Sequence, residues 1–446
     1  MVFTSLRLRN LKCYKDTGKI RLSPLTIIVG PNNAGKSTLL QSILLLKQTL
    51  EDKALREPLI TAGRFGDFGS YFDILRGGRE AEELAIRIDL SITRVDARQA
   101  VSSTGSPSRA VSQAPTQLEL DFGCDRQTGS AHLSSLRIAD DGVPILRVLR
   151  KDSVYAVEGL TPSAHSALDV DFNHFLPQFT PKFATAREKS LGEILHLFRL
   201  ASFCTRTWTR ALREVSYVAP LRVSIPRYAV VGSMAATEMD PGGENLLRVL
   251  SKQEKVRGTH RTLEEWLRYW TAERFRLVAG LRLVKVDQDG LVVALVGDES
   301  TGFKGINVAS AGKGLSQLLP ILANVLTTRD GQCLLIEQPE LHLHPAAQAT
   351  LADLFIENLG KGRRQYIVET HSEHLLMRVR TRIAEGKLDS SDVSILFVRK
   401  GVEQSEVSEV RVKPNGQLEN WPEGFFEEAY NEAWALAEAN PPAGTH

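Results

Sequence analysis

Residues 25–50 constrain the fold more than any other stretch of the chain. An apolar run at Leu25–Val29 is followed by GPNNAGKST at Gly30–Thr38 and by an apolar periodic stretch at Leu39–Leu50. Glycines at this spacing let backbone N–H groups turn toward an anion, and the following helix adds the positive end of its dipole. Strand, glycine loop and helix in this order are the context that a phosphate-binding loop requires. The sequence therefore predicts an α/β fold that binds a nucleoside triphosphate.

Two side chains of this loop carry the expected phosphate chemistry. Lys36 is expected to reach the β- and γ-phosphates, and the Ser37 hydroxyl is expected to hold Mg²⁺. The other loop residues that we expect to contact ATP are Asn32, Asn33, Ala34, Gly35 and Thr38.

A second apolar strand supplies the other half of the predicted site. Cys333–Glu340 reads CLLIEQPE, and Glu337 at the end of the run is expected to approach Mg²⁺ or its coordinated water. This segment lies 300 residues beyond Ser37, a separation typical of an ATPase divided by a large insertion. A third strand-like stretch, Gln365–Ser372, reads QYIVETHS, and its apolar part is followed by an exposed histidine, His371.

Composition limits the class of protein but not its partners. The 446 residues allow about three domain-sized units, or one large core with insertions. The 55 basic and 53 acidic side chains give no overall positive field, so net charge does not indicate nucleic-acid binding. Four scattered cysteines favour reduced thiols in a cytoplasmic protein. We expect no signal peptide and no transmembrane helix, because no apolar window is long enough.

The chain divides into three predicted regions: 1–92, 93–214 and 215–446. Residues 3–9 alternate apolar and polar side chains, which predicts an edge strand. Residues 94–116 are rich in small and polar types and predict a mobile surface loop.

Regular elements are expected after this loop. Expected strands are 117–122, 131–138, 143–148, 154–157, 281–286 and 291–296, and expected helices are 186–214 and 262–275. Arg206, Arg210 and Arg213 lie at helical spacing and could form a basic stripe, although a solvated helix face is the favoured interpretation.

The ordered motifs carry a family resemblance. GPNNAGKST, LLIEQPELHLHP and YIVETHSEHLL together resemble the ABC-type ATPase cores of the overcoming-lysogenization-defect, structural-maintenance-of-chromosomes and RecF-like group. The chain is most similar to a bacterial AAA-family group that ends in a short tail like Asn420–Phe426. The resemblance covers residues 1–90 and 215–430. It implies a P-loop fold of two lobes with a β-rich and helical insertion, and ATP held between two protomers.

Further site residues follow from this resemblance. Ser310–Gln317 resembles the signature segment that caps the partner's ATP, with Ser310, Gly312 and Gly314 as the contacting residues. Small residues that open a helix offer free N–H groups to a γ-phosphate. His344 occupies the D-loop aspartate position, and His371 occupies the position of the switch histidine that contacts the γ-phosphate. His342 and His374 are interpreted as structural.

The chain departs from the wider group at two places. Gln338 stands where the group has the glutamate that polarises the attacking water, and an amide orients water but takes no proton. Hydrolysis is therefore expected to be slow, to depend on Glu340, or to wait for a partner. No clear Q-loop follows the phosphate loop; Phe65–Asp73 is the candidate segment, and Gln41 is interpreted only as a helix position.

The resemblance also frames the expected function. Nuclease-bearing relatives append a metal-binding TOPRIM domain, for which the 75 residues after His371 leave no room. We therefore expect a stand-alone ATPase that dimerises around ATP and signals to a separately encoded effector such as a nuclease, in bacterial anti-phage defence. One alternative is a RecF-type DNA-repair ATPase, which would need a basic groove; the hints of one are Arg206, Arg210, Arg213 and the Lys361–Arg364 run. The other is a nucleotide-gated scaffold that does not hydrolyse ATP.

Overall fold

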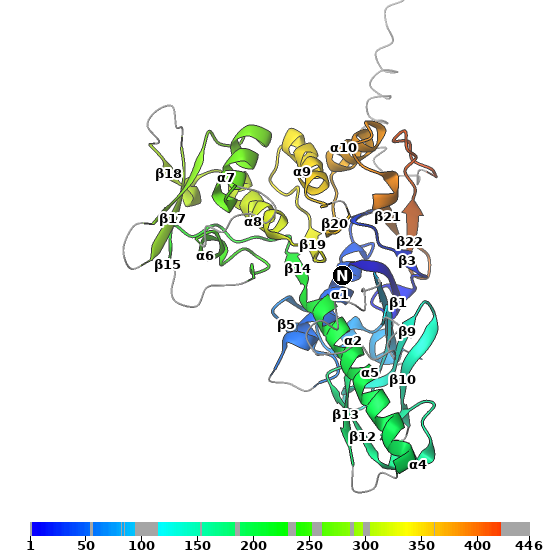
Figure 1. The fold of residues 1–446 in the computed structure, drawn as a ribbon. Coiled ribbons are helices and arrows are strands. Elements are labelled where there is room, and N and C mark those ends of the chain that lie inside the picture. Colours follow the sequence, from blue (N-terminus) through cyan, green and yellow to red (C-terminus); the bar gives the residue numbers. More distant parts are fainter. Residues whose placement is uncertain are drawn as a thin grey trace, which may run out of the picture.

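The strands of the chain form two principal sheets, one mostly parallel and one antiparallel (Figure 1). The computed structural model describes residues 2–53, 57–81, 83, 85–93, 115–151, 154–182, 188–230, 238–251, 261–285, 290–297, 304–360 and 362–420. Helices and strands alternate around the parallel sheet, which confirms the predicted α/β class. The predicted loop at 94–116 lies almost entirely outside the described residues, as does the tail beyond Asn420.

The six-stranded sheet contains all three apolar runs that the sequence singled out. Its order is β14 (Val215–Val218), β19 (Cys333–Glu337), β20 (Gln365–Glu369), β4 (Leu25–Val29), β21 (Val393–Lys400) and β22 (Ser405–Val410). Neighbours from β14 to β21 run parallel, and β22 is antiparallel to β21. Every residue of β4, β19 and β20 is buried. Burial on both faces explains why these strands read as continuous apolar runs.

Successive residues of these strands face two different cores. Ile28 packs in a cluster with α1 (Lys36–Glu51), whereas Ile27 and Val29 pack in a second cluster. The second cluster contains α8 (Lys313–Thr327), α9 (Pro345–Glu357) and α10 (Glu373–Ala384). The phosphate loop thus begins at a strand that is fixed from both sides.

The antiparallel sheet forms the second lobe. Its order is β11 (Val154–Val157), β10 (Val143–Lys151), β9 (Ala131–Asp140), β8 (Gln117–Cys124), β7 (Ile86–Ile92), β1 (Phe3–Leu11) and β2 (Tyr14–Asp16), and β3 (Ile20–Arg21) also pairs with β1. The expected boundary at residue 92 thus falls within one sheet, because β8 pairs directly with β7. The three-part division stays a prediction.

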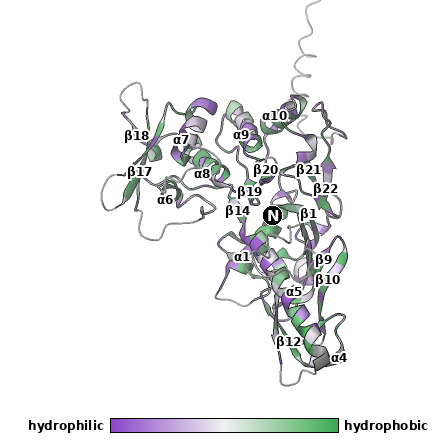
Figure 2. Cartoon of the chain, in the orientation of Figure 1, coloured by the Kyte–Doolittle hydropathy of each residue, from purple (hydrophilic) through white to green (hydrophobic). Residues whose placement is uncertain are grey.

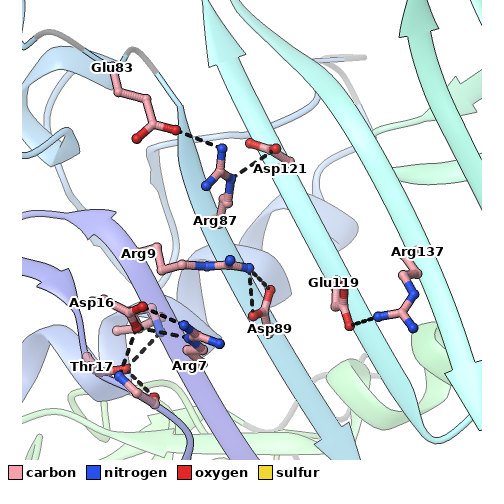
Figure 3. A network of polar contacts seen from close by, with 12 residues as sticks. Arg7, Arg9, Asp16, Thr17, Glu83, Arg87, Asp89, Glu119, Asp121 and Arg137 are labelled. Carbon is pink, nitrogen blue, oxygen red and sulfur yellow. Dashed lines mark hydrogen bonds and ion pairs between the residues drawn. The ribbon is translucent and has the colours of Figure 1, made fainter. Parts of the chain in front are cut away.

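One face of this sheet carries ion pairs between neighbouring strands. Figure 3 shows Arg9 with Asp89, Arg87 with Asp121, and Glu119 with Arg137. Such partly exposed pairs contribute at most about 1 kcal/mol each. The opposite, apolar face therefore supplies most of the stability of the lobe, through fully buried residues such as Ile88, Leu120 and Leu136.

The prediction that residues 3–9 form an edge strand is wrong. β1 pairs with β7 on one side and with β2 and β3 on the other. Alternation of apolar and polar side chains indicates that one face of the strand is buried. Interior strands of an antiparallel sheet show this alternation as readily as edge strands do.

Helix α5 (Glu188–Arg213) lies along the antiparallel lobe. Its buried residues Ile194, Leu197, Ala201, Cys204 and Trp208 recur at intervals of three and four, so one stripe faces the core. In Figure 2, hydrophobic (green) and hydrophilic (purple) residues alternate along the ribbon of this helix. Smaller elements complete the lobe: β5 (Ala62–Gly63), β6 (Gly66–Asp67), α2 (Tyr71–Ile74), η1 (Gly78–Glu80), α4 (Pro162–Ser166), β12 (Leu168–Asn173) and β13 (Leu176–Pro181).

A smaller sheet lies beside α8 on the left of Figure 1. It contains β15 (Ala229–Val230), β17 (Leu291–Val296), β16 (Leu281–Lys285) and β18 (Ile306–Asn307). Its neighbours are α6 (Leu246–Leu250), α7 (Leu263–Arg268), the π-helical η2 (Tyr269–Arg274) and η4 (Val308–Ser310), while η5 (Ser390–Asp392) precedes β21. The expected helix at 262–275 is thus an α-helix that continues as a π-helix.

Candidate nucleotide site

Two glycines give the phosphate loop its shape. Gly30 has φ 144°, and a Cβ there would overlap the Val398 carbonyl oxygen of β21. Gly35 has φ 103° and caps α1, and a Cβ there would overlap the Cys13 Sγ. The Tyr14 hydroxyl donates to the Gly35 carbonyl at 3.0 Å. The loop is therefore held between β21 and the turn that joins β1 to β2.

The loop places a buried ammonium group beside exposed backbone. Asn32 and Asn33 are exposed, whereas Ala34, Lys36 and Thr38 are buried. Lys36 Nζ donates to the Pro31 carbonyl at 2.7 Å, and burial lowers the pKa of this ammonium group. A phosphate group would replace the carbonyl with a stronger, charged acceptor.

Two carboxylates lie side by side next to Ser37. Glu337 ends β19 and Glu369 ends β20, and the two residues are direct partners in the parallel register. The Ser37 hydroxyl donates to Glu369 Oε1 at 3.0 Å, and the Tyr217 hydroxyl donates to Glu337 Oε1 at 2.9 Å. Glu369 Oε2 is buried, and none of the described residues forms a hydrogen bond with it.

The environment of these two carboxyl groups disfavours negative charge. Burial, with Glu369 as the next cause, raises the pKa of Glu337 to about 7. Burial also raises the pKa of Glu369, against the Ser37 hydrogen bond and the Lys36 charge. A divalent cation would stabilise both ionised forms.

The sequence interpretation missed Glu369. The available signal was that Gln365–Glu369, like Cys333–Glu337, is an apolar strand that ends in a carboxylate. Only the pairing of the two strands shows that both carboxylates reach the same edge of the sheet.

Glu340 holds the segment that carries His371. Its Oε1 accepts from the His371 backbone N–H at 2.6 Å, and its Oε2 accepts from the Thr370 hydroxyl at 2.8 Å. Thr370 N donates to the Ile28 carbonyl of β4 at 3.0 Å. His371 is exposed, and its pKa is lowered by desolvation and by the Lys36 charge. These bonds hold His371 at the same edge of the sheet as Lys36, because the two residues follow the carboxyl ends of the paired parallel strands β20 and β4.

Gln338 adopts an unusual backbone conformation beside the carboxylates. Its φ is 44°, and its N–H donates to the Glu369 carbonyl at 2.8 Å. Its own carbonyl accepts from Arg222 Nη2 at 3.0 Å. Arg222 is buried, and its Nε donates to Gln317 Oε1 on α8 at 3.1 Å. Arg222, which the sequence interpretation did not assign, therefore connects Gln338 to the signature-like helix.

The signature-like segment presents its small residues to solvent. Gly312 is the N-cap of α8, and Ser310 ends η4; both are exposed. A Cβ at Gly314 would lie 3.0 Å from the His342 carbonyl oxygen, so this turn packs against the segment before α9. His344 is the N-cap of α9, and its Nδ1 accepts from the Ala346 N–H at 3.4 Å. The nucleotide roles of these residues stay predictions.

The candidate Q-loop segment lies close to the turn before β2. Phe68 lies under the Lys12 ammonium group, with Nζ 5.6 Å from the ring centroid. Lys12 Nζ donates to Gln41 Oε1 at 2.9 Å, so the side-chain oxygen of Gln41 accepts a hydrogen bond from a lysine. Lys12 is half-buried, and burial lowers its pKa while the Glu337 charge raises it.

Oxygen donors around Ser37 suit Mg²⁺, which commonly takes one or two carboxylates together with substrate phosphates. Ser37 and the Glu337–Glu369 pair provide such a set, and within the described ranges no side chain or backbone group is bonded to Glu369 Oε2. Within the described ranges, no group of three or more His, Cys, Asp or Glu side chains forms a separate metal site. No helix in that part of the chain is long and apolar enough to cross a membrane.

Three protein-family models match the chain. Residues 1–99 match "AAA ATPase domain", and residues 161–378 match "AAA domain, putative AbiEii toxin, Type IV TA system". Residues 388–436 match a family of proteins of unknown function. The comparison with curated proteins found no match.

Solved structures with similar arrangements include heads of structural-maintenance-of-chromosomes proteins. One, bound to the C-winged helix domain of ScpA, has 14% identity and a TM-score of 0.44, over 93% of this chain and 98% of that one. The head from Thermotoga maritima has 12% identity and a TM-score of 0.42, over 92% and 100%. The head from Pyrococcus furiosus, bound to the C-terminal domain of ScpA, has 13% identity and a TM-score of 0.43, over 98% of each chain.

Proposed function

The chain carries AAA-family ATPase domains, and from this premise we propose that it has an ABC-type core and that it binds and slowly hydrolyses ATP between two copies of itself. One observation carries the proposal. The phosphate loop, Glu337, Gln338 and His371 meet at the carboxyl ends of adjacent parallel strands, where ligands bind in α/β sheets.

Each residue then has a defined task. Lys36 binds the β- and γ-phosphates, and Ser37 with Glu337 holds the cation, whose charge neutralises the phosphate oxygens. Gln338 orients the attacking water through its amide, and His371 contacts the γ-phosphate. Glu340 positions His371 and Thr370 through both of its carboxylate oxygens, and in this role it takes no proton from water.

The exposed first turn of α8 supports the proposed dimer. Ser310 and Gly312 lie at a helix N-terminus whose free N–H groups suit a γ-phosphate. In a sandwich dimer these groups would cap the ATP of the partner subunit. Arg222 would transmit this contact to Gln338, because it binds Gln317 of the same helix.

The proposed biological role is regulation of a separately encoded effector, such as a nuclease, in the cytoplasm and in anti-phage defence. Support comes from the matched family, whose description names a toxin of a type IV toxin–antitoxin system. The time between ATP binding and hydrolysis would then determine how long the effector remains in its regulated state.

The DNA-repair alternative has little support from the basic residues. Arg206, Arg210 and Arg213 are exposed, but Arg210 pairs with Glu214 at 2.9 Å. Arg363 and Arg364 both pair with Asp330. A DNA-binding protein would show a steep loss of affinity with salt, and we expect no such binding here.

Steady-state phosphate release tests the proposal. Wild type should turn over slowly, Lys36→Ala should not turn over, and Gln338→Glu should be faster by about 10²-fold because it restores a general base. Lys19→Ala, at an exposed lysine between β2 and β3, is the matched control and should behave as wild type. A Gln338→Glu variant that hydrolyses ATP no faster than wild type would show that Gln338 is not the cause of slow hydrolysis. Wild type that binds ATP without turnover would instead favour the nucleotide-gated scaffold.

Light scattering with and without ATP tests the dimer. ATP should convert the wild-type monomer to a dimer, and Ser310→Arg should block this by filling the opening of α8. Ser163→Arg, an exposed serine of α4 in the other lobe, is the control. Dimerisation of Ser310→Arg at wild-type ATP concentrations would contradict the sandwich arrangement.

A further inference from the structure

Glu369 is hydrogen-bonded to Ser37 of the phosphate loop, and the proposed function leaves it without a task. It ends β20 and is buried, yet it makes one side-chain hydrogen bond among the described residues, from the Ser37 hydroxyl. Its second oxygen, Oε2, is buried, and no residue in the described part of the chain donates a hydrogen bond to it. A buried carboxylate oxygen with no donor is costly, so a missing ligand is the direct explanation.

The surroundings indicate what that ligand is. Ser37 Oγ and Glu337, the residues that the proposed function assigns to the cation, lie on either side of Glu369: one is bonded to it and the other is its register partner. A phosphate group would be repelled by two neighbouring carboxylates. A divalent cation is attracted by both, and hard cations prefer oxygen ligands.

We propose that Glu369 is a direct ligand of the divalent cation, so that Ser37, Glu337 and Glu369 form a site that binds the metal before the nucleotide arrives. The proposal rests on the proposed function, since it extends the same phosphate site. Magnesium sites in nucleotide enzymes often have one or two protein carboxylates and receive their remaining ligands from phosphates and water. A second carboxylate makes the site more negative, and this allows the metal to bind in the absence of a nucleotide.

The alternative role is that Glu369 only positions the Ser37 hydroxyl. The two roles respond differently to substitution. Glutamine keeps an oxygen that accepts the Ser37 hydrogen bond, but it lacks the charge that a metal ligand supplies. Aspartate keeps the charge with a shorter reach. Glu369→Gln therefore preserves positioning and removes metal binding.

Manganese alone is the probe. Mn²⁺ is titrated into the full-length, nucleotide-free protein, and free Mn²⁺ is followed by its electron paramagnetic resonance signal. We expect one Mn²⁺ per chain for wild type and an affinity lower by about tenfold or more for Glu369→Gln, because site affinity follows ligand charge. Glu369→Asp should retain more affinity than Glu369→Gln.

The chain offers a matched control in the same sheet. Glu409 on β22 also accepts from a serine hydroxyl, that of Ser394, at 3.3 Å. Glu409→Gln makes the same chemical change away from the phosphate loop and should bind Mn²⁺ as wild type does. Wild type that binds no Mn²⁺, or Glu369→Gln that binds it with wild-type affinity, would overturn the proposal.

Binding of a fluorescent ATP analogue in EDTA separates this proposal from the proposed function. Glu369→Gln should bind the metal-free analogue as tightly as wild type or more tightly, because it removes a negative charge near the phosphates. If wild type binds the analogue and Glu369→Gln binds Mn²⁺ as tightly as wild type does, only the role of Glu369 is refuted. Absence of analogue binding to wild type, with or without metal, would refute the phosphate site itself.

Discussion

The raised pKa of Glu337 makes the metal-free protein less stable as pH increases. Burial beside Glu369 raises this pKa from 4.5 to about 7, so the folded state holds a proton that the unfolded state has released. The favourable contribution is complete below pH 4.5 and is lost as pH rises through about 7. A shift of this size corresponds to about 3 kcal/mol.

Glu337→Gln removes this titration while keeping the side-chain shape. Urea unfolding in EDTA between pH 5 and pH 8 gives the free energy of unfolding of both proteins. The difference between variant and wild type cancels the other titrating groups and should grow toward high pH by about 1.4 kcal/mol per pH unit at most. A difference that stays flat over this range would refute the assignment of the titration to Glu337. When saturating Mg²⁺ replaces EDTA, this difference between variant and wild type should change less steeply with pH.

The remaining predictions concern the scaffold of the site. Gly30→Ala should abolish ATP binding and reduce soluble yield, because its Cβ would overlap the Val398 carbonyl; fluorescence titration checks this, and tight binding would contradict it. Arg222→Met should cost about 2 kcal/mol in urea unfolding, since it removes bonds to Gln317 and Gln338, and it should weaken ATP-dependent dimerisation. Glu340→Gln should leave ATP affinity within about threefold but lower turnover by about tenfold or more, because the His371 segment loses a charged acceptor. Phosphate release measures that effect, and unchanged turnover would argue against positioning.

Local sequence patterns predicted the phosphate loop and most of the elements around it. Leu25–Val29 is fully buried, and α1 begins at Lys36, directly after the glycine loop. Strand-forming runs at 281–286 and 291–296 became β16 and β17 with nearly the expected bounds. These elements follow from periodicity and glycine placement, which act over a few residues.

Arrangements that depend on distant pairing were not predictable in the same way. The prediction that β1 is an edge strand is wrong, because the alternation of apolar and polar side chains does not indicate how many neighbours a strand has. Glu369 reaches Ser37 only because β20 pairs with β4, two strands separated by more than 300 residues. Arg222 likewise gains its role from tertiary contacts with Gln317 and Gln338.

Binding of ATP to the phosphate loop is the claim on which the rest depends. Titration of a fluorescent ATP analogue with Mg²⁺ into wild type, Lys36→Ala and Lys19→Ala measures it directly. The account predicts one nucleotide per chain for wild type and Lys19→Ala. It predicts binding weaker by about tenfold or more for Lys36→Ala, because the buried ammonium group supplies a charge-assisted hydrogen bond to phosphate. Equal binding by all three proteins, or no binding by wild type, would contradict the account.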